Sequence, residues 1–170
     1  MKTIAYLPTG TEARFVEIPL SQGKVALVDV EDAAAVLQHR WYAQCIGQVW
    51  YAQRSLKMPD GQWGKQRLHV FLTGYAMTDH RNGDGLDNTR ANLRAATKVE
   101  NGRNRAMQAN NAAGFKGVSW DSARCKWRAQ IKTAGPSRYI GRFDTAEQAA
   151  RAYDEAARAA FGEYAHLNFP

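Results

Sequence analysis

The C-terminal third of the chain constrains the fold more tightly than any other segment. Three runs of alternating or β-branched residues predict three strands, at 115–120, 126–133 and 138–143. Asp144-Thr145 then caps a helix, with Glu147 and Gln148 in the first turn as a capping box requires, and Gly162 ends it. The face of this helix that repeats at helical spacing is mostly alanine, and such small side chains allow a helix to lie close to a sheet. We therefore expect three strands covered by one helix.

The middle strand of this segment has two chemically different faces. Side chains alternate along a strand, so Trp127, Ala129 and Ile131 share one face. The other face is basic and able to form hydrogen bonds, and it carries Lys126, Arg128, Gln130 and Lys132. Residues 111–143 hold seven basic and one acidic side chain, whereas 144–170 hold two and five. This concentrated positive charge favours binding to a polyanion such as nucleic acid.

Composition narrows the classes of protein to which the chain can belong. The chain has 170 residues and a net charge of +7. Its two cysteines, Cys45 and Cys125, are too far apart in sequence for a zinc-binding pair, and they do not support a disulfide framework. The first residues lack the apolar core of a signal peptide, and no run of about 20 apolar residues could span a membrane. We expect a soluble cytoplasmic protein with reduced thiols.

The first 68 residues read as a β-rich region. Strands are expected at 12–19 and 24–30, a short helix at 31–39, and a hairpin turning at Ile46-Gly47. The stretch 68–72 fits either a strand or the start of a short helix. This region either touches DNA, through Arg40, Arg54 or Lys57, or only supports the rest of the fold.

Residues 79–104 carry the side chains that point to hydrolytic chemistry. Asp79 is adjacent to His80, and Asn92, Asn101 and Asn104 follow. A carboxylate is a hard ligand for a divalent metal, and a histidine can take a proton from water near neutral pH. The stretch from 97 to about 107 has helical composition, so Asn101 and Asn104 would project from one helical face.

The run TDHRNGDGLDNTRANLRAATKVENGRN resembles the HNH (ββα-metal) nucleases of the phage and intron-encoded homing type. The resemblance covers about residues 69–106. It implies that Asp79 and Asn101 bind one metal ion, Mg²⁺ or Mn²⁺, that His80 is the general base, and that Asn92 orients His80. The implied products have 5′-phosphate and 3′-hydroxyl ends.

The sequence leaves more than one role possible for several residues near this motif. His69 would support the active site or contact phosphate, or else it is structural. Asn104 would join the metal site, bind phosphate or cap the helix. Arg94, Arg103 and Arg105 suit contacts with DNA phosphates.

Residues 115–170 resemble the plant APETALA-two/ethylene-response-factor DNA-binding domain. The shared elements include Gly117-Val118, Tyr139-Ile-Gly141 and Leu167-Asn-Phe-Pro170. The resemblance implies a three-stranded antiparallel sheet that lies in the DNA major groove. The DNA-contacting residues expected there are Lys116, Trp120, Arg124, Lys126, Arg128, Gln130, Lys132, Tyr139 and Arg142. Ser119 and Ser137 stand where the plant family usually has arginine, so the plant target sequence is not carried over.

Together these features predict an α+β chain with three parts. A nuclease domain at 1–107 comprises a β-rich support at 1–68 and a ββα-metal core at 69–107. A linker at 108–114 leads to the DNA-binding domain at 115–170. The expected function is a metal-dependent endonuclease of the nicking or homing type, phage-encoded or bacterial, acting on double-stranded DNA as a monomer or homodimer. The alternatives are a non-catalytic DNA-binding regulator with a nuclease-like fold and, less favoured, an RNA-binding or RNA-cleaving protein.

Overall fold

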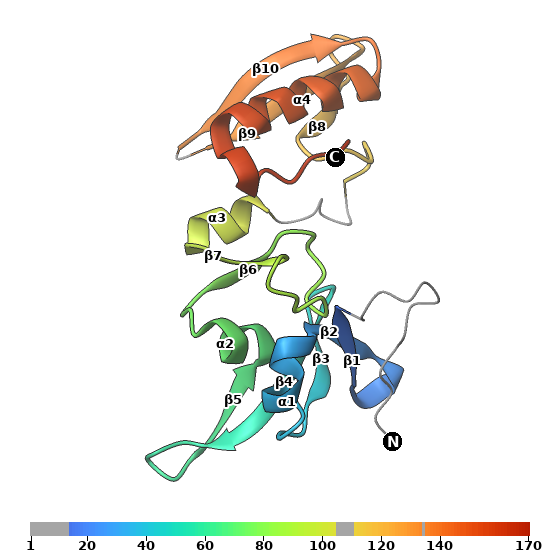
Figure 1. Cartoon of the computed structure of the whole chain (residues 1–170). Helices are drawn as coiled ribbons and strands as arrows, with labels where there is room; N and C mark the ends of the chain where they lie inside the picture. Colours follow the sequence, from blue (N-terminus) through green and yellow to red (C-terminus); the bar gives the residue numbers. More distant parts are fainter. Residues whose placement is uncertain (1–13, 105–110, 134) are drawn as a thin grey trace, which may run out of the picture. The chain divides into compact units, whose positions relative to one another are not determined.

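The computed structural model describes residues 14–104, 111–133 and 135–170, which form an α+β structure of small antiparallel sheets (Figure 1). The chain divides into two compact units, the first ending at Thr97 and the second beginning at Lys98. The predicted domain boundary at 107 and the linker at 108–114 remain predictions, because residues 105–110 lie outside the described part. None of the described helices is long and apolar enough to span a membrane.

The first unit begins with a hairpin that carries a helix. β1 (Phe15–Pro19) and β2 (Val25–Asp29) pair antiparallel across the short 3-10 helix η1 (Ser21–Gly23), and α1 (Val30–Val36) follows. The core of this unit gathers apolar side chains from both strands, α1 and later segments, namely Ile18, Ala26, Val28, Ala33, Val36, Trp41, Ala52 and Leu68. The Trp41 indole donates a hydrogen bond to the Val36 carbonyl at 2.9 Å. This bond satisfies a carbonyl at the end of α1.

A three-stranded antiparallel sheet follows in the same unit. It consists of β3 (Tyr42–Ile46), β4 (Val49–Lys57) and β5 (Trp63–Arg67), with β4 in the centre. The predicted hairpin around Ile46-Gly47 is confirmed, and Gly47 supplies the positive φ of its turn. The stretch 68–72, left open between strand and helix, forms α2 (Leu68–Thr73) and ends at a left-handed Gly74.

A second, shorter hairpin carries the Asp-His pair. β6 (Thr78–His80) pairs antiparallel with β7 (Leu93–Ala95), with Asp79 opposite Arg94 and His80 opposite Leu93. The intervening loop meets the first hairpin, because the Leu27 amide donates to the Leu86 carbonyl at 2.9 Å. Next along the chain is the helix α3 (Lys98–Arg103), which is grouped with the second unit. The predicted helix is therefore confirmed over its described residues.

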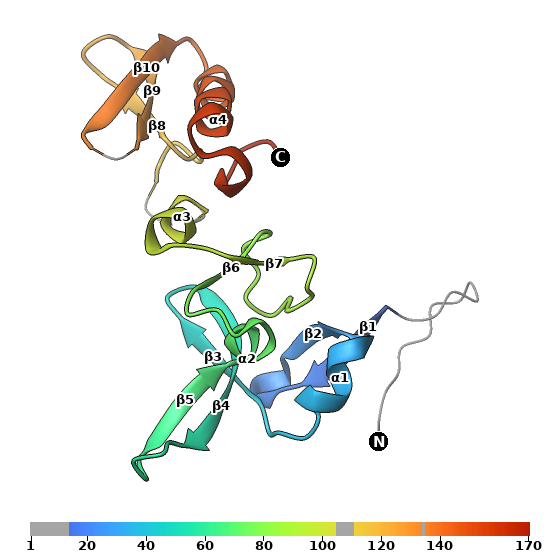
Figure 2. The same cartoon turned by 60° about the vertical axis from the view of Figure 1, so that its left-hand side comes forward.

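The second unit contains the predicted sheet and helix (Figure 2). β8 (Val118–Asp121), β9 (Lys126–Lys132) and β10 (Ser137–Phe143) form an antiparallel sheet with β9 in the centre. α4 (Ala146–Phe161) packs on it, followed by the 3-10 helix η2 (Gly162–Tyr164). The capping box of Thr145 and Gln148 is confirmed.

The alanine face of α4 lies against the sheet as predicted. Ala149, Ala150 and Ala157 are fully buried, and they pack with Ala129 and Ile131 of β9 in two adjoining clusters. Gly117 has φ +77°, and a Cβ there would lie 2.1 Å from Cδ2 of Tyr153. Only glycine fits this close approach between the start of the sheet and the helix.

Candidate functional site

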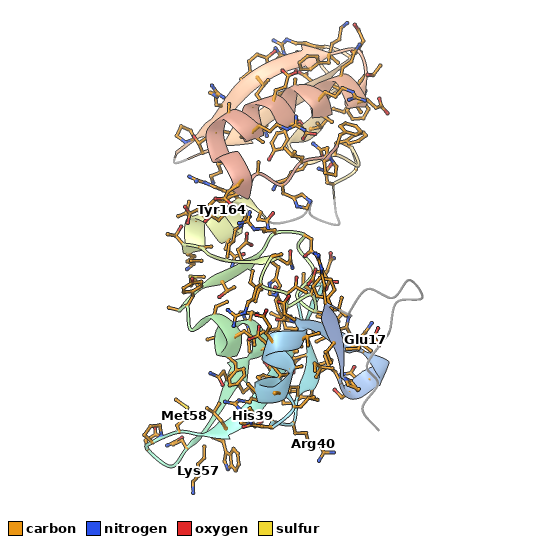
Figure 3. The ribbon with its side chains drawn as sticks, in the orientation of Figure 1. Glu17, His39, Arg40, Lys57, Met58 and Tyr164 are labelled. Carbon is orange, nitrogen blue, oxygen red and sulfur yellow. The ribbon has the colours of Figure 1, made fainter. Side chains whose placement is uncertain are left out.

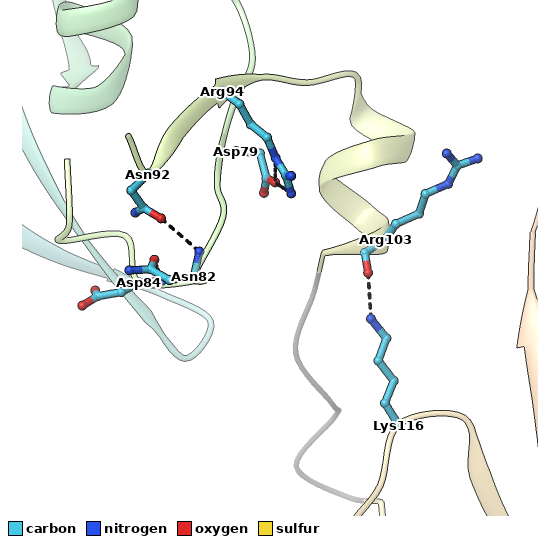
Figure 4. Close-up of polar contacts among 7 residues, drawn as sticks. All are labelled: Asp79, Asn82, Asp84, Asn92, Arg94, Arg103 and Lys116. Atoms are coloured by element: carbon cyan, nitrogen blue, oxygen red, sulfur yellow. Dashed lines mark hydrogen bonds and ion pairs between the residues drawn. The ribbon is translucent and has the colours of Figure 1, made fainter. Parts of the chain in front are cut away.

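Asp79 forms a buried ion pair across the β6–β7 hairpin. Asp79 is only 3 % exposed. The Arg94 guanidinium donates two hydrogen bonds to Asp79 Oδ2, from Nε at 2.8 Å and from Nη2 at 2.5 Å (Figure 4). The antiparallel register places these two residues directly opposite each other. Arg94, expected to contact DNA phosphate, is thus a partner of the predicted metal ligand in this structure.

His80 lies next to Asp79 and is 6 % exposed. Burial lowers the pKa of the His80 imidazole, whereas a hydrogen bond with Asn88 and the charges of Asp79, Asp84 and Asp87 act in the opposite direction. The net shift is downward, so the ring is neutral near pH 7. A neutral imidazole can accept a proton, which a general base must do.

His69 lies beside His80, although eleven residues separate them in sequence. Their ring centroids are 4.9 Å apart in an edge-to-face arrangement, and the Tyr51 ring lies 5.9 Å from each. Burial lowers the pKa of His69 to about 3, with smaller contributions from the charges of His80 and Arg67. His69 therefore stays neutral at physiological pH, and the structure brings it to the candidate site as one of the two predicted alternatives requires.

Asn92 clamps the loop that follows His80. Its Oδ1 accepts a hydrogen bond from the Asn82 amide at 3.0 Å, and its Nδ2 donates to the Asp87 carbonyl at 2.8 Å (Figure 4). The backbone adds a bond from the Arg81 amide to the Asn92 carbonyl at 2.9 Å. Asn92 thus fixes the backbone on both sides of the loop, and its predicted effect on His80 would act through that backbone.

The loop itself is held by short side-chain contacts to the backbone. Asn82 Oδ1 accepts from the Asp84 amide, and Asp84 Oδ1 accepts from the Leu86 amide, both at 2.9 Å. Gly85 lies against β4, where a Cβ would be 2.4 Å from the Trp50 carbonyl oxygen. The tight turn chemistry of Asn82-Gly-Asp therefore seats the loop on the three-stranded sheet.

Tyr51 and Asn88 are site residues that sequence reasoning did not single out. Tyr51 contacts both histidine rings from β4, and nothing in its local sequence signals this. Asn88 is buried, and its Nδ2 donates to the Leu86 carbonyl at 2.9 Å. Asn88 lies within the run that resembles the HNH nucleases, but no role was predicted for it.

The predicted metal ligands fit a hard divalent ion by their chemistry. The described residues contain no group of three or more His, Cys, Asp or Glu that could hold a metal. One carboxylate and one amide, Asp79 and Asn101, instead match Mg²⁺, which keeps most of its water and uses one or two carboxylates. Asn101 lies on α3 in the second unit and is half-buried, and Asn104 at the end of α3 is buried.

Lys116 and Arg103 hold α3 within the second unit. The Lys116 ammonium donates to the Arg103 carbonyl at 2.7 Å (Figure 4). The Arg103 guanidinium carbon lies 4.9 Å from the centroid of the Phe161 ring. Burial lowers the pKa of Lys116 to about 8, although the charge of Asp154 opposes the shift. Both residues were predicted to contact DNA, but their described contacts are with the protein. Arg105 lies outside the described residues.

The β9 strand presents the two faces that its sequence predicts. Ala129 and Ile131 are buried on the α4 side, whereas Arg128, Gln130 and Lys132 alternate with them. On the neighbouring strands the register places Ser119, Tyr139 and Arg142 beside these polar residues. We call this set the β9 polar face, and its members are Ser119, Lys126, Arg128, Gln130, Lys132, Tyr139 and Arg142.

Two acidic residues at one end of the β9 polar face, Asp121 and Asp144, form ion pairs with its cations. Asp121 accepts from Arg142 Nε at 2.8 Å and lies 3.7 Å from Arg124, and the hydrogen bond from Arg142 lowers the Asp121 pKa. Lys126 pairs with Asp144. These contacts fix the end of the face without covering it.

Trp120 stands apart from the other residues expected to contact DNA. The register pairs it with Trp127, and their ring centroids are 5.1 Å apart. By strand alternation this pair belongs to the α4 side of the sheet, yet Trp120 remains 49 % exposed.

Comparisons with known proteins support both parts of the chain. The AP2 domain family matches residues 113–163. The uncharacterized HNH endonuclease L560 of Acanthamoeba polyphaga mimivirus is 29 % identical over 156 residues, covering 86 % of this chain and 76 % of that protein.

Two further relatives match mainly one part of the chain. Dehydration-responsive element-binding protein 2A of Arabidopsis thaliana is 44 % identical over 66 residues, 36 % of this chain and 18 % of that protein. Protein 3.8 of Escherichia phage T7 is 37 % identical over 57 residues, 34 % of this chain and 47 % of that protein. No solved structure gives a significant match. The resemblance predicted from the motifs is confirmed: this chain carries an AP2 domain and is similar over most of its length to an HNH endonuclease.

Proposed function

We propose that this chain is a metal-dependent DNA endonuclease in which the β6–β7 hairpin carries the hydrolytic residues and the β9 polar face binds double-stranded DNA. The proposal rests on the buried, neutral imidazole of His80. Burial keeps its imidazole neutral, the charge of the preceding residue, Asp79, acts on it, and the ring lies against a second neutral histidine. This is the state that a general base needs near pH 7.

His80 would take the proton from the water that attacks the scissile phosphate. The P–O bond to the 3′ oxygen then breaks, which leaves a 5′-phosphate and a 3′-hydroxyl. Asp79 and Asn101 would hold one Mg²⁺ or Mn²⁺ ion, whose positive charge would stabilise the negative charge that develops on the leaving oxygen. Asn92 keeps the loop after His80 in place through its two hydrogen bonds.

The β9 polar face would supply affinity and site choice. Arg128 and Lys132 suit phosphates or guanine edges, and Gln130 suits adenine. A sheet with a basic outer face and a helix on its inner face can enter the major groove of DNA. The similarity to plant factors named for binding a response element supports this assignment.

A specific observation favours the non-catalytic alternative. The Arg94 guanidinium already neutralises Asp79, and a divalent cation would have to share or take over that carboxylate. If it cannot, the chain would bind DNA without cutting it.

Incubation of the protein with supercoiled plasmid and Mg²⁺ or Mn²⁺ distinguishes the endonuclease from the non-catalytic DNA-binding regulator. The proposal expects metal-dependent conversion to open-circular DNA, abolished by EDTA and by His80→Ala. One site cuts one strand, so linear product would indicate paired sites. Salt-sensitive binding without cleavage, tested on genomic DNA to exclude a missing target, would support the regulator instead.

A further inference from the structure

The β3–β4–β5 sheet of the first unit has an outer face on which only Tyr51 belongs to the candidate active site, and the proposed function leaves the rest of this face unused. The register pairs Tyr42 with Gln53, Gln53 with Arg67, Ser55 with Lys65, and Lys57 with Trp63. Residues paired across strands share a face. We call this the β4 outer face, and its members are Tyr42, Gln44, Ile46, Val49, Tyr51, Gln53, Ser55, Lys57, Trp63, Lys65 and Arg67.

The charge of the β4 outer face has one sign. The three strands contain no aspartate or glutamate, and Lys57, Lys65 and Arg67 are all exposed on this face. Trp63, at its far end, is 75 % exposed. A shallow hollow of about 450 Å³ lies on the face, lined by Gln44, Ile46, Gln53, Lys65 and Arg67. Cations, amides and an exposed ring, with no carboxylate on the three strands themselves, suit a phosphate backbone.

The opposite face of the same sheet carries Arg54, whose guanidinium contacts other protein side chains. Arg54 donates from Nε to Gln66 at 3.0 Å, and its guanidinium carbon lies 4.7 Å from the centroid of the Phe71 ring. This arginine, one of those that sequence reasoning offered for DNA contact, is used in packing. Lys57, another of them, extends outward at the end of β4 (Figure 3).

The β4 outer face leads directly to the candidate active site within the first unit. The Arg67 guanidinium carbon lies 5.1 Å from the centroid of the Tyr51 ring, and that ring contacts His69 and His80. Gly85 of the loop after His80 packs against the same tyrosine. A duplex whose phosphate reaches His80 would therefore have its neighbouring phosphates close to this face.

We propose that the β4 outer face is a second DNA-binding surface, which holds the phosphate backbone of the duplex beside the position that His80 would cut. Its location next to the scissile phosphate rests on the proposed function, whereas the binding itself does not. The cations act as point contacts with phosphate, so this surface contributes affinity and position rather than sequence choice.

The test compares two double variants of the full chain on duplex DNA in EDTA, where no metal-dependent cleavage occurs. Lys57→Ala/Lys65→Ala removes two cations from the β4 outer face. Arg14→Ala/Lys24→Ala removes two cations of the same unit that lie off this face, since Arg14 precedes β1 and Lys24 lies over the Trp50 ring on the opposite face of β4. Each phosphate contact contributes about 0.9 to the slope of log affinity against log salt.

The first variant should therefore flatten that slope by about 1.8, and hydroxyl-radical footprinting should lose one block of protection while another persists. The control should keep the wild-type slope and footprint. An unchanged slope in the first variant, or an equal loss in the control, overturns the proposal. Because the readout is binding, a failure of the nuclease proposal would appear separately, as absence of metal-dependent cleavage with this surface intact.

Discussion

The β6–β7 hairpin and the β9 polar face use polar side chains in opposite ways. In the hairpin, Asp79, His80 and Arg94 are buried and in contact with other protein groups. On the sheet, Arg128 and Lys132 stand on the side away from the core. Buried polar groups must be satisfied by the protein, so substitutions there disturb folding and chemistry together. Exposed cations can be removed with little effect on folding, so substitutions there should affect binding alone.

The largest expected effect on stability comes from Arg94→Ala. Removing this arginine deletes its buried ion pair with the Asp79 carboxylate, which costs about 3–5 kcal/mol. Urea unfolding should detect the loss. The control, Arg124→Ala, removes an exposed arginine, and Asp121 keeps its shorter ion pair with Arg142, so the loss should be much smaller. Equal losses in the two variants would remove the contrast between buried and exposed charges.

Arg128→Ala should weaken binding without weakening the fold. Loss of one arginine contact to a base edge or phosphate costs about 1–3 kcal/mol of binding free energy, measured by fluorescence anisotropy in EDTA. Arg138→Ala is the matched control, because Arg138 pairs with Ile131 and so belongs to the α4 side of the sheet. A larger loss for Arg138 would mean that the wrong face has been assigned to DNA.

His69 should make the first unit sensitive to acid. Its pKa is about 3 in the folded chain against an ordinary value of 6.5, so the unfolded chain binds the proton first. Its stabilising contribution is complete above pH 6.5 and is lost as pH falls toward 3, by about 1 kcal/mol per pH unit. His69→Phe should therefore flatten the pH dependence of unfolding relative to His39→Phe. Parallel curves for wild type and His69→Phe would contradict this.

The smallest effect is expected at the start of α4. Thr145 Oγ1 accepts from the Gln148 amide at 3.2 Å, and loss of such a cap costs about 1 kcal/mol. Thr145→Ala should lower the thermal midpoint of the protein while Thr145→Ser retains it. A lower midpoint in both would show that the methyl group, rather than the hydroxyl, matters.

The sheet and α4 could be predicted from sequence because their signals are local. Alternation along 126–133, the capping box at Thr145 and the alanine spacing of α4 each depend on residues a few positions apart. The Asp79-His80 pair was found for the same reason, since the two residues are adjacent.

The surroundings of His80 could not be predicted, because they depend on the packing of distant segments. Tyr51 is 29 residues from His80, and the pairing of Arg94 with Asp79 follows from the hairpin register. Lys116 illustrates the same limit. Its charge indicated DNA, but burial against α3 gives it a protein carbonyl as its partner.

The most direct test separates cutting from binding on one DNA substrate. For His80→Ala and Arg128→Ala, the cleavage rate at saturating protein with Mg²⁺ is compared with the Kd in EDTA. His80→Ala should lower the rate by about 10²–10⁴ and leave Kd unchanged, whereas Arg128→Ala should raise Kd and leave the saturated rate unchanged. If His80→Ala keeps the wild-type rate, or if both variants change both quantities equally, the division between a cutting hairpin and a binding sheet is wrong.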